Sequence, residues 1–419
     1  MQTLRSRIRL ETTSWACLAL TLALLEGGVT GLLIQQQFSA QLYEWQVNLA
    51  VAVATGAPFF ANLFSMIWVR LSQGRNKADL ISRLAMLCCL CSAGLAWMPV
   101  NEAGLVGLLI LLVIARVCWS GITTLRSVIW RGNYPRNIRA RITARYTTVF
   151  ALATSVAALA AGWLIEQGIT AFQLLSAVFA LIALWASWRY RHLTLRRQAI
   201  LADKPGSTLT LLQMPALFRA DQAFARYMLA MFILGAGNLM LIGLLVVGIH
   251  RFTGVLPWQQ IMITSAIPML IIPFAVRWWA RLLEGNHIFF FRIWHGAGLT
   301  LAMSVFLLAL ATGSEWLLFI GSACYGLAQS GGAIGWNLGH NDFSDNDRAL
   351  DYMAVHVTLT GVRGLLAPLL GISFYQLLVQ VDLGHLALLL PVSLVAIGTL
   401  MFVVYHRQNL HQLKQDELV

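Results

Sequence analysis

Three charged side chains lie deep inside long apolar segments of this sequence: Glu26, Arg116 and Arg363. Each stands roughly 20 Å from the end of its segment that is predicted below to be cytoplasmic, at ~1.5 Å per residue of helix. A charge at that depth in lipid costs ~3 kcal/mol or more unless it faces a cavity or a partner. We therefore interpret all three as functional residues; the alternative is a static ion pair that fixes helix packing.

A second group of ionisable residues lies between Gly335 and Gly364, a stretch with four aspartates and two histidines. The stretch lacks the glycine and closing glutamate of a calcium-binding loop. It also holds no nucleophile next to a base. We therefore expect neither a metal site nor a catalytic cluster, and the protein is predicted to have no enzyme activity and no cofactor.

Six cysteines all lie in apolar segments. Cys88 and Cys91 share a helix face and could bind a soft metal. No histidine or aspartate nearby completes a tetrahedral set of ligands, so packing within a membrane helix is the favoured interpretation.

The elements that position these residues follow from the composition. Of 419 residues, 58% are hydrophobic and 11% are charged, whereas a soluble domain carries about 25% charged residues. Apolar segments long enough to cross a ~30 Å hydrocarbon layer recur along the chain. They are far longer than the strands of a membrane barrel. The sequence predicts an all-α membrane protein with twelve transmembrane helices, at 13–34, 46–69, 79–98, 104–130, 143–165, 170–189, 224–248, 258–281, 288–311, 316–340, 351–377 and 385–405.

The loops predict the domain organisation and the orientation. We expect a six-helix bundle at 1–189, a polar central loop at 190–222, a second six-helix bundle at 223–406 and a tail at 407–419. Lys and Arg gather in alternate loops and acids in the others, which predicts that both termini are cytoplasmic. The net charge of +12 is thereby explained without a nucleic acid partner.

An internal repeat supports two related halves. The stretches "PFFANLFSMIW" from Pro58 and "PMLIIPFAVRW" from Pro268 share proline and tryptophan at a shift of 210 residues. Parallel repeats of this kind are typical of transporters whose site lies at the interface of the repeats.

Local motifs resemble those of the major facilitator superfamily. The stretch "SMIWVRLSQGRNK" keeps the glycine–arginine step of that family's loop between helices two and three, but not its aspartate. "RVCWSG" is similar to the fourth-helix arginine–glycine element with one residue more, and "SVAALAAGWL" lacks the glycine–proline element of the family's antiporters. The resemblance implies two pseudo-symmetric six-helix bundles, alternating access, and a central cavity lined by helices one and four.

On this resemblance Glu26 is expected to carry a proton, with Arg116 as its partner. Burial favours the neutral acid and the arginine favours the carboxylate, so alternating access could change which effect dominates. Two arginines against one glutamate favour an anionic solute. The alternative for Arg363 is that it reaches the membrane surface or bonds to backbone carbonyls. Further polar residues are expected to line the cavity: His356, Tyr325, Asn62, Asn238, Gln329 and Asn337.

Three local details are also predicted. The "GAG" before Asn238 permits a break in the seventh helix, while Pro268 and Pro273 should kink the eighth. His356 and Thr360 share a helix face with Arg363. His295 stands alone in the ninth helix and is interpreted as a hydrogen-bonded packing residue.

A cytoplasmic gate is predicted from opposite charges. The loop between helices two and three is basic and the segment that enters helix eleven is acidic, which reverses the polarity usual in the family. The gate residues are Arg70, Arg75, Lys77, Asp347 and Asp351, flanked by Arg139 and Arg348.

Three functions remain open. The first is a proton-coupled secondary transporter of a small organic solute, possibly an exporter, in a bacterial inner (plasma) membrane. The second is a uniporter or exchanger of organic anions without proton coupling, and the third is a non-transporting membrane sensor or assembly factor. A nucleotide-driven pump is disfavoured, because the sequence contains no G-x-x-x-x-G-K-[ST] motif. The expected partners are membrane lipid, a small-molecule substrate and protons, and the protein is expected to be a monomer.

Overall fold

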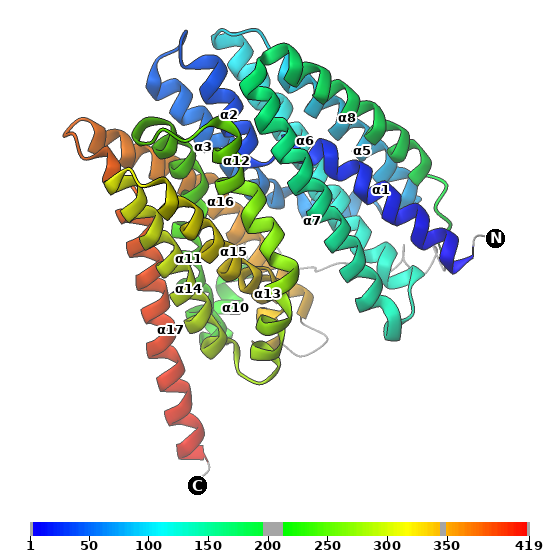
Figure 1. The fold of residues 1–419 in the computed structure, drawn as a ribbon. Helices are drawn as coiled ribbons and strands as arrows, with labels where there is room; N and C mark the ends of the chain where they lie inside the picture. The colour runs from blue at the N-terminus through cyan, green and yellow to red at the C-terminus, as the bar shows by residue number, and fades with distance from the viewer. Residues whose placement is uncertain (1–2, 196–212, 344–348, 417–419) are drawn as a thin grey trace. The chain divides into compact units, whose positions relative to one another are not determined.

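The computed structural model describes residues 3–195, 213–343 and 349–416, and the regular elements in these ranges are helices (Figure 1). Twelve helical spans among them are long and apolar enough to cross a membrane, which confirms the predicted number. The helices of the first half are α1 Leu4–Leu24, α2 Gly27–Phe38, α3 Glu44–Phe60, α4 Ser65–Leu71, α5 Lys77–Gly94, α6 Glu102–Asn133, α7 Arg136–Gln167 and α8 Ile169–Tyr190. Those of the second half are α10 Met214–Ala220, α11 Gln222–Phe252, α12 Pro257–Ile261, α13 Ile267–Glu284, α14 Ile288–Thr312, α15 Glu315–Leu338, α16 Ala349–Val379 and α17 Leu389–Asp416.

The chain forms two compact units. The first unit comprises residues 1–206 together with 255–270, and the second comprises 207–254 with 271–419. The segment 255–270 belongs to the first unit because α12 packs against α7. Gly162 permits this approach, since a β-carbon there would lie 3.0 Å from Cα of Trp258.

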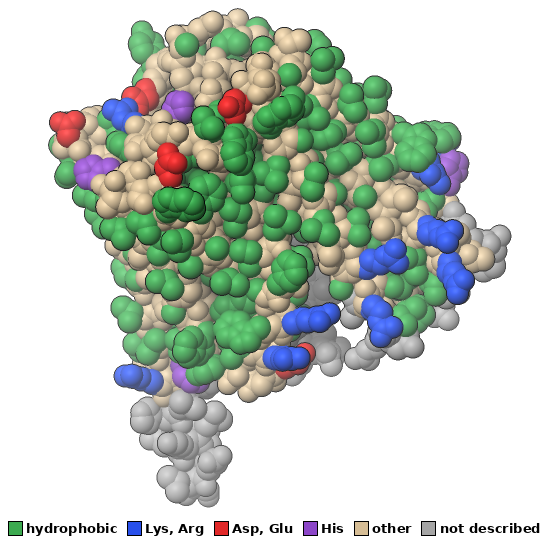
Figure 2. All heavy atoms as spheres, viewed as in Figure 1, with side chains coloured by type: hydrophobic (Ala, Val, Ile, Leu, Met, Phe, Trp, Pro, Cys, Tyr) green, Lys and Arg blue, Asp and Glu red, His purple; other side chains and the backbone are tan. Residues whose placement is uncertain are grey.

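Large apolar side chains cover much of the surface. In Figure 2 hydrophobic side chains occupy most of the visible face, and charged side chains lie toward its margins. Phe274 and Trp316 are each about four-fifths exposed, with relative areas of 82% and 80%. A surface this apolar is stable only in contact with hydrocarbon, which agrees with twelve spanning helices.

The first predicted helix is interrupted, which the sequence analysis did not anticipate. Helix α1 ends at Leu24 and α2 begins at Gly27, with Glu26 in an extended conformation between them. Gly27 and Gly28 allow close packing at the break. A β-carbon at Gly27 would lie 3.2 Å from Cα of Thr55, and one at Gly28 would collide with the side chains of Thr264 and Ser265.

The eighth span departs from regular helix just before its first proline. Residues Met262–Ala266 form a π-helical turn in which the N–H of Ile267 donates to the carbonyl of Met262. Pro268 lacks an N–H and its ring would clash with the carbonyl of Thr264, four residues earlier, so a widened turn at this place is the expected adjustment. Pro273 lies inside α13.

The break predicted at "GAG" in the seventh span is wrong, because α11 is continuous from Gln222 to Phe252. The glycines serve close packing instead. A β-carbon at Gly237 would lie 2.6 Å from the carbonyl oxygen of Pro391, and Gly235 makes room for an arginine described below.

Each of the two units contains an equivalent tryptophan contact within itself. The indole N–H of Trp68 donates to the carbonyl of Val117 at 3.1 Å, and that of Trp279 donates to the carbonyl of Leu327 at 2.7 Å. Each indole also packs on a glycine of the same helix as its acceptor, Gly121 or Gly331. The internal repeat pairs Trp68 with Trp278, but the side chain of Trp278 is exposed. Trp279 is the structural equivalent of Trp68.

Candidate functional site

Glu26 and Arg116 meet at the break between α1 and α2. Nη2 of Arg116 lies 3.6 Å from Oε1 of Glu26, and the same nitrogen donates to the carbonyl of Leu25. The Arg116 side chain is 4% exposed and the Glu26 side chain is 26% exposed. The arginine is therefore enclosed within the unit, while the carboxylate is partly exposed at the surface of the unit.

The charges at this break suit the ends of the two helices. A helix that ends inside a membrane leaves carbonyls without partners, and Arg116 satisfies the one at Leu25. Its positive charge lies at the carboxyl end of α1, where the helix dipole is negative. Glu26 is the N-cap residue of α2, where the dipole favours a negative charge. Each charge of the ion pair therefore has the sign that the dipole of the neighbouring helix end favours.

Arg363, in the second unit, packs against the backbone of α11. It donates to the carbonyl of Met231, and Nη2 donates to Oγ1 of Thr360 at 2.8 Å. A β-carbon at Gly235 would stand inside the guanidinium group. The glycine is thus required for this arginine to reach α11.

His356 is fully buried and lies on the same face of α16 as Arg363, two turns earlier. Neither of its ring nitrogens has a hydrogen-bond partner in the described part of the chain. Its ring lies edge-on to that of Trp336, with centroids 5.7 Å apart. A buried imidazole without partners is costly and needs an explanation.

The other predicted cavity residues have mixed environments. Oη of Tyr325 donates to Oδ1 of Asn238 at 3.3 Å, joining α15 to α11. Gln329 and Asn62 are half-buried, the latter in the first unit. Asn337 is exposed, and its amide donates to Ala333 of its own helix at 2.7 Å.

His295 has a hydrogen-bond partner, as expected of a packing residue, but it is not isolated. Its Nδ1 lies 3.4 Å from Nη1 of Arg292, and Nη2 of Arg292 donates to Oη of Tyr227 at 3.1 Å. Arg292 is 1% exposed. Sequence reasoning missed it because it stands only one turn inside α14, where an arginine usually reaches the membrane surface.

A buried carboxylate, Glu11, was also missed. Tyr134 donates to Oε1 at 2.8 Å, and the indoles of Trp130 and Trp15 donate to Oε2 at 2.7 and 3.4 Å. Burial raises the pKa of the Tyr134 phenol far above its usual range, so it stays a donor. Its one hydrogen goes to Glu11, and Tyr146 must donate to Tyr134 across 2.8 Å. The signal available in the sequence was the single acid within Leu4–Leu24, four residues before a tryptophan.

An aromatic cage lies beside this carboxylate. The guanidinium carbon of Arg126 lies 5.3, 5.5 and 5.1 Å from the ring centroids of Trp15, Trp119 and Trp130. Cation–π contacts of this kind hold an arginine inside an apolar bundle. Glu11 and Arg126 together tie α1 to α6, so we interpret the group as structural.

The predicted gate residues are only partly described. Arg70 lies in the last turn of α4 and is exposed, and Arg75 is exposed in the following turn. Lys77 begins α5 and is buried. Asp351 is half-buried in the first turn of α16. Asp347 and Arg348 lie outside the described residues, as does the side chain of Arg139. The gate stays a prediction.

The acids and cysteines show no metal-binding geometry in the described ranges. Asp342 has a structural role, because its Oδ2 accepts a hydrogen bond from the N–H of Ile288 at 2.7 Å. This contact satisfies one of the free N–H groups at the start of α14. The six cysteines are free thiols.

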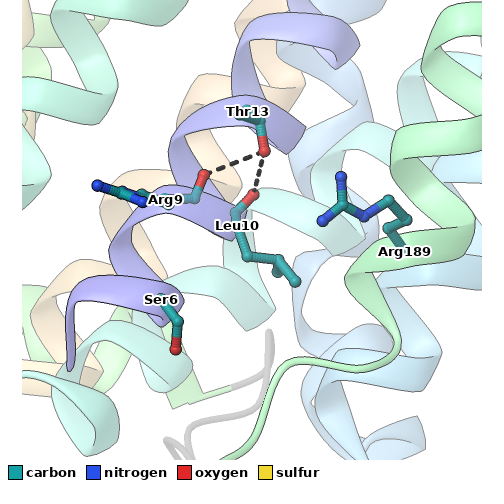
Figure 3. Close-up of a pocket in the computed structure, with 5 residues that line it drawn as sticks. All are labelled: Ser6, Arg9, Leu10, Thr13 and Arg189. Carbon is teal, nitrogen blue, oxygen red and sulfur yellow. Dashed lines mark hydrogen bonds between the residues drawn. The ribbon is translucent and has the colours of Figure 1, made fainter. Parts of the chain in front are cut away.

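One cavity in the first unit lies apart from these polar groups. It measures about 320 Å³ and is lined by Ser6, Arg9, Leu10, Thr13 and Arg189 (Figure 3). Oγ1 of Thr13 donates to the carbonyls of Arg9 and Leu10, both at 3.0 Å. The cavity lies between α1 and α8 and contains neither Glu26 nor Arg116.

Comparisons with known proteins agree with this architecture. A family model described as Major Facilitator Superfamily matches residues 16–368. A comparison with curated proteins finds no sequence match. Among solved structures, a D-xylose–proton symporter is 13% identical over 94% of this chain and 96% of its own, with a TM-score of 0.73. The nucleoside transporter NupG (D323A mutant) is 12% identical over 94% and 99%, with a TM-score of 0.70.

A third structure is the bacterial homolog of the human lysosomal transporter Spinster. It is 14% identical over 97% of this chain and 98% of its own, with a TM-score of 0.67. At these identities the similarity establishes the fold and leaves the solute open. The family model covers most of the chain, and the twelve spans fit it. The chain is therefore an integral multi-pass membrane protein that belongs to the Major Facilitator Superfamily of transporters.

Proposed function

We propose that the protein is a secondary transporter that moves a small organic solute across a bacterial inner membrane by alternating access, coupled to protons at Glu26. Both termini are cytoplasmic in this proposal, as the distribution of Lys and Arg favours. The observation that carries it is the ion pair at the break of the first span, 3.6 Å between Arg116 and Glu26.

A proton carrier must change its charge without leaving its site, and the geometry supports this for Glu26. Its carboxylate is partly exposed, so water can deliver a proton. Arg116 keeps a second acceptor, the carbonyl of Leu25. Protonation of Glu26 therefore weakens one interaction of the arginine without leaving the guanidinium entirely unpaired. The free energies of the protonated and ionised forms of Glu26 beside Arg116 then differ modestly. A ligand or a proton gradient can shift the equilibrium between them.

The second candidate is uniport or exchange of an organic anion without protons. It is favoured by the buried arginines, Arg116 and Arg363, which outnumber the single carboxylate at mid-depth. In that case Glu26 is a fixed counter-ion, and its neutral variant still transports. A sensor or assembly factor built on the same fold is the third candidate, and it binds solute without moving it.

A ligand screen followed by counterflow tests the proposal. The purified protein is heated with a panel of metabolites and drugs at two pH values, and compounds that raise the melting temperature are kept. Proteoliposomes loaded with an unlabelled hit should then accumulate the labelled compound. Binding without counterflow would contradict transport and favour the sensor. If a pH gradient does not change the accumulation of the labelled compound, proton coupling is contradicted and the exchanger is favoured.

A further inference from the structure

Four buried side chains of the second unit form a cationic cluster: Arg292, His295, His356 and Arg363. Their exposed fractions are 1, 2, 0 and 3%. They come from α14 and α16, which both contact α11. Arg292 donates to Oη of Tyr227 and Arg363 donates to the carbonyl of Met231, so both arginines contact α11 within about one turn of each other.

Among the described residues the cluster carries positive charge without an acidic partner. Neither Arg292 nor Arg363 forms one of the ion pairs found there, such as Arg116 with Glu26. Their partners are neutral: Tyr227 and His295 for Arg292, and Met231 and Thr360 for Arg363. Two buried cations that contact neighbouring turns of one helix without an anion are strongly unfavourable. An arrangement like this persists where an anion binds it.

Several donors in the cluster are also unused. Nε of Arg292 and Nε of Arg363 have no hydrogen-bond partner in the described ranges, nor do Nε2 of His295 and both nitrogens of His356. An arginine Nε–H and its neighbouring Nη–H form the planar fork that suits a carboxylate. An oxyanion could accept from both Nε–H groups and from at least one nitrogen of His356, since a neutral imidazole has one donor and a protonated one has two.

Aromatic rings surround the charged groups. The guanidinium of Arg363 lies 5.8 Å from the ring of Phe232, and that of Arg292 lies 5.9 Å from the ring of Phe291. Phe291 also stacks on His295 with an interplanar angle of 12°, and Trp336 lies against His356. Apolar surroundings favour an organic anion with an apolar body over a strongly hydrated inorganic ion.

We propose that the cationic cluster binds the carboxylate group of a small, largely apolar organic acid, and that this acid is the transported solute. The substrate part of the inference rests on the transport function proposed above, whereas the binding part does not. Arg292 and Arg363 hold the carboxylate, and the two histidines donate to it as neutral or protonated imidazoles. Arg292 is essential to this site, although it stands outside the group of residues expected from the sequence.

Equilibrium binding to the purified full-length protein tests the inference without any transport. Melting temperatures are measured with acetate, butyrate, benzoate and phenylacetate, each beside its primary amide, at constant ionic strength. We expect at least one carboxylate to raise the melting temperature by about 2 °C or more, a shift typical of saturating binding in a protein of this size. Its amide, which lacks the charge, should have no effect.

Variants assign the binding to the cluster. Arg292→Gln and Arg363→Gln should abolish the ligand-induced shift, and Arg363→Lys should reduce it because the planar fork is lost. Arg281→Gln, which changes an exposed arginine of α13, should leave it intact. The unliganded Arg292→Gln protein should melt no lower than wild type, since it no longer buries an unpaired cation.

Several results would overturn the inference. They are equal shifts with acid and amide, no shift with any of the four acids, a shift with inorganic phosphate alone, or a full shift in both glutamine variants. Failure of the proposed transport is distinguishable, because proteoliposomes would then show no counterflow while the carboxylate shift remained.

Discussion

Nη2 of Arg116 donates to the carbonyl of Leu25 while lying 3.6 Å from the carboxylate of Glu26, so one guanidinium stabilises both sides of a broken membrane helix. A break in a spanning helix is stable only where other groups satisfy its backbone. Here the group that does so is also the counter-ion of the acid at the break. Helix geometry and the charge of Glu26 are therefore linked through one side chain.

Removal of Arg116 should destabilise the protein. Arg116→Ala leaves the buried carbonyl of Leu25 without its donor, which costs ~1–3 kcal/mol. Arg116→Lys keeps the charge and one contact, so its loss of stability should be smaller. Thermal melting of the three proteins checks this order. If the Arg116→Ala protein is as stable as wild type, the helix break at Leu25 and Glu26 does not need the arginine for its stability.

Glu11 should matter for stability but not for coupling. Glu11→Ala removes the acceptor of three hydrogen bonds in a dry environment, and we expect a loss of ~3 kcal/mol or more. Tyr146→Phe removes one bond of the same network and should cost ~1 kcal/mol. Melting temperatures give both values. If Glu11→Gln abolishes coupling while Glu26→Gln does not, the coupling residue is Glu11.

Gly235 and Arg363 should show strong energetic coupling. In Gly235→Ala the new methyl group collides with the guanidinium, and overpacking of this kind costs ~1–3 kcal/mol. In the background of Arg363→Gln, whose shorter side chain does not reach Gly235, the same change should be nearly neutral. A double-mutant cycle on melting free energies measures the difference. Equal costs in both backgrounds would contradict the contact.

The predicted gate can be tested by accessibility. Asp351→Arg removes an acid that we expect to face Arg70 or Arg75 when the cytoplasmic side is closed, so the open form should gain population. Exposed pairs contribute only ~0–1 kcal/mol each, and the shift should be partial. A cysteine introduced by Asn337→Cys should be labelled from the cytoplasm faster in the Asp351→Arg protein than in the protein with Asp351. Addition of Arg75→Asp to the Asp351→Arg protein should partly reverse this increase. Labelling rates that are the same in all three proteins would remove the gate.

The sequence was a good guide to the helices, because a spanning segment must be long and apolar. It predicted the twelve spans. It did not predict the break at Glu26, since a two-residue interruption hardly changes the length of an apolar segment. Glutamate followed by Gly27-Gly28 was the only local signal.

The buried clusters were harder to predict. Arg292 and Glu11 stand near the ends of their spans, where a charge usually costs little. Only the packing of other helices around them makes them buried. Trp68 and Trp279 illustrate the same limit, because a shift of one residue decides which of two adjacent tryptophans turns inward.

Proton movement in proteoliposomes tests the central proposal most directly. Liposomes that contain the protein and a trapped pH-sensitive dye are mixed with the solute identified by the ligand screen, with protein-free liposomes as the control for passive permeation. Wild type and Glu166→Gln, which alters an exposed carboxylate of the same unit, should show solute-dependent proton flux. Glu26→Gln should bind the solute with the same melting shift and move no protons. Proton flux in Glu26→Gln equal to that of wild type would contradict coupling at Glu26.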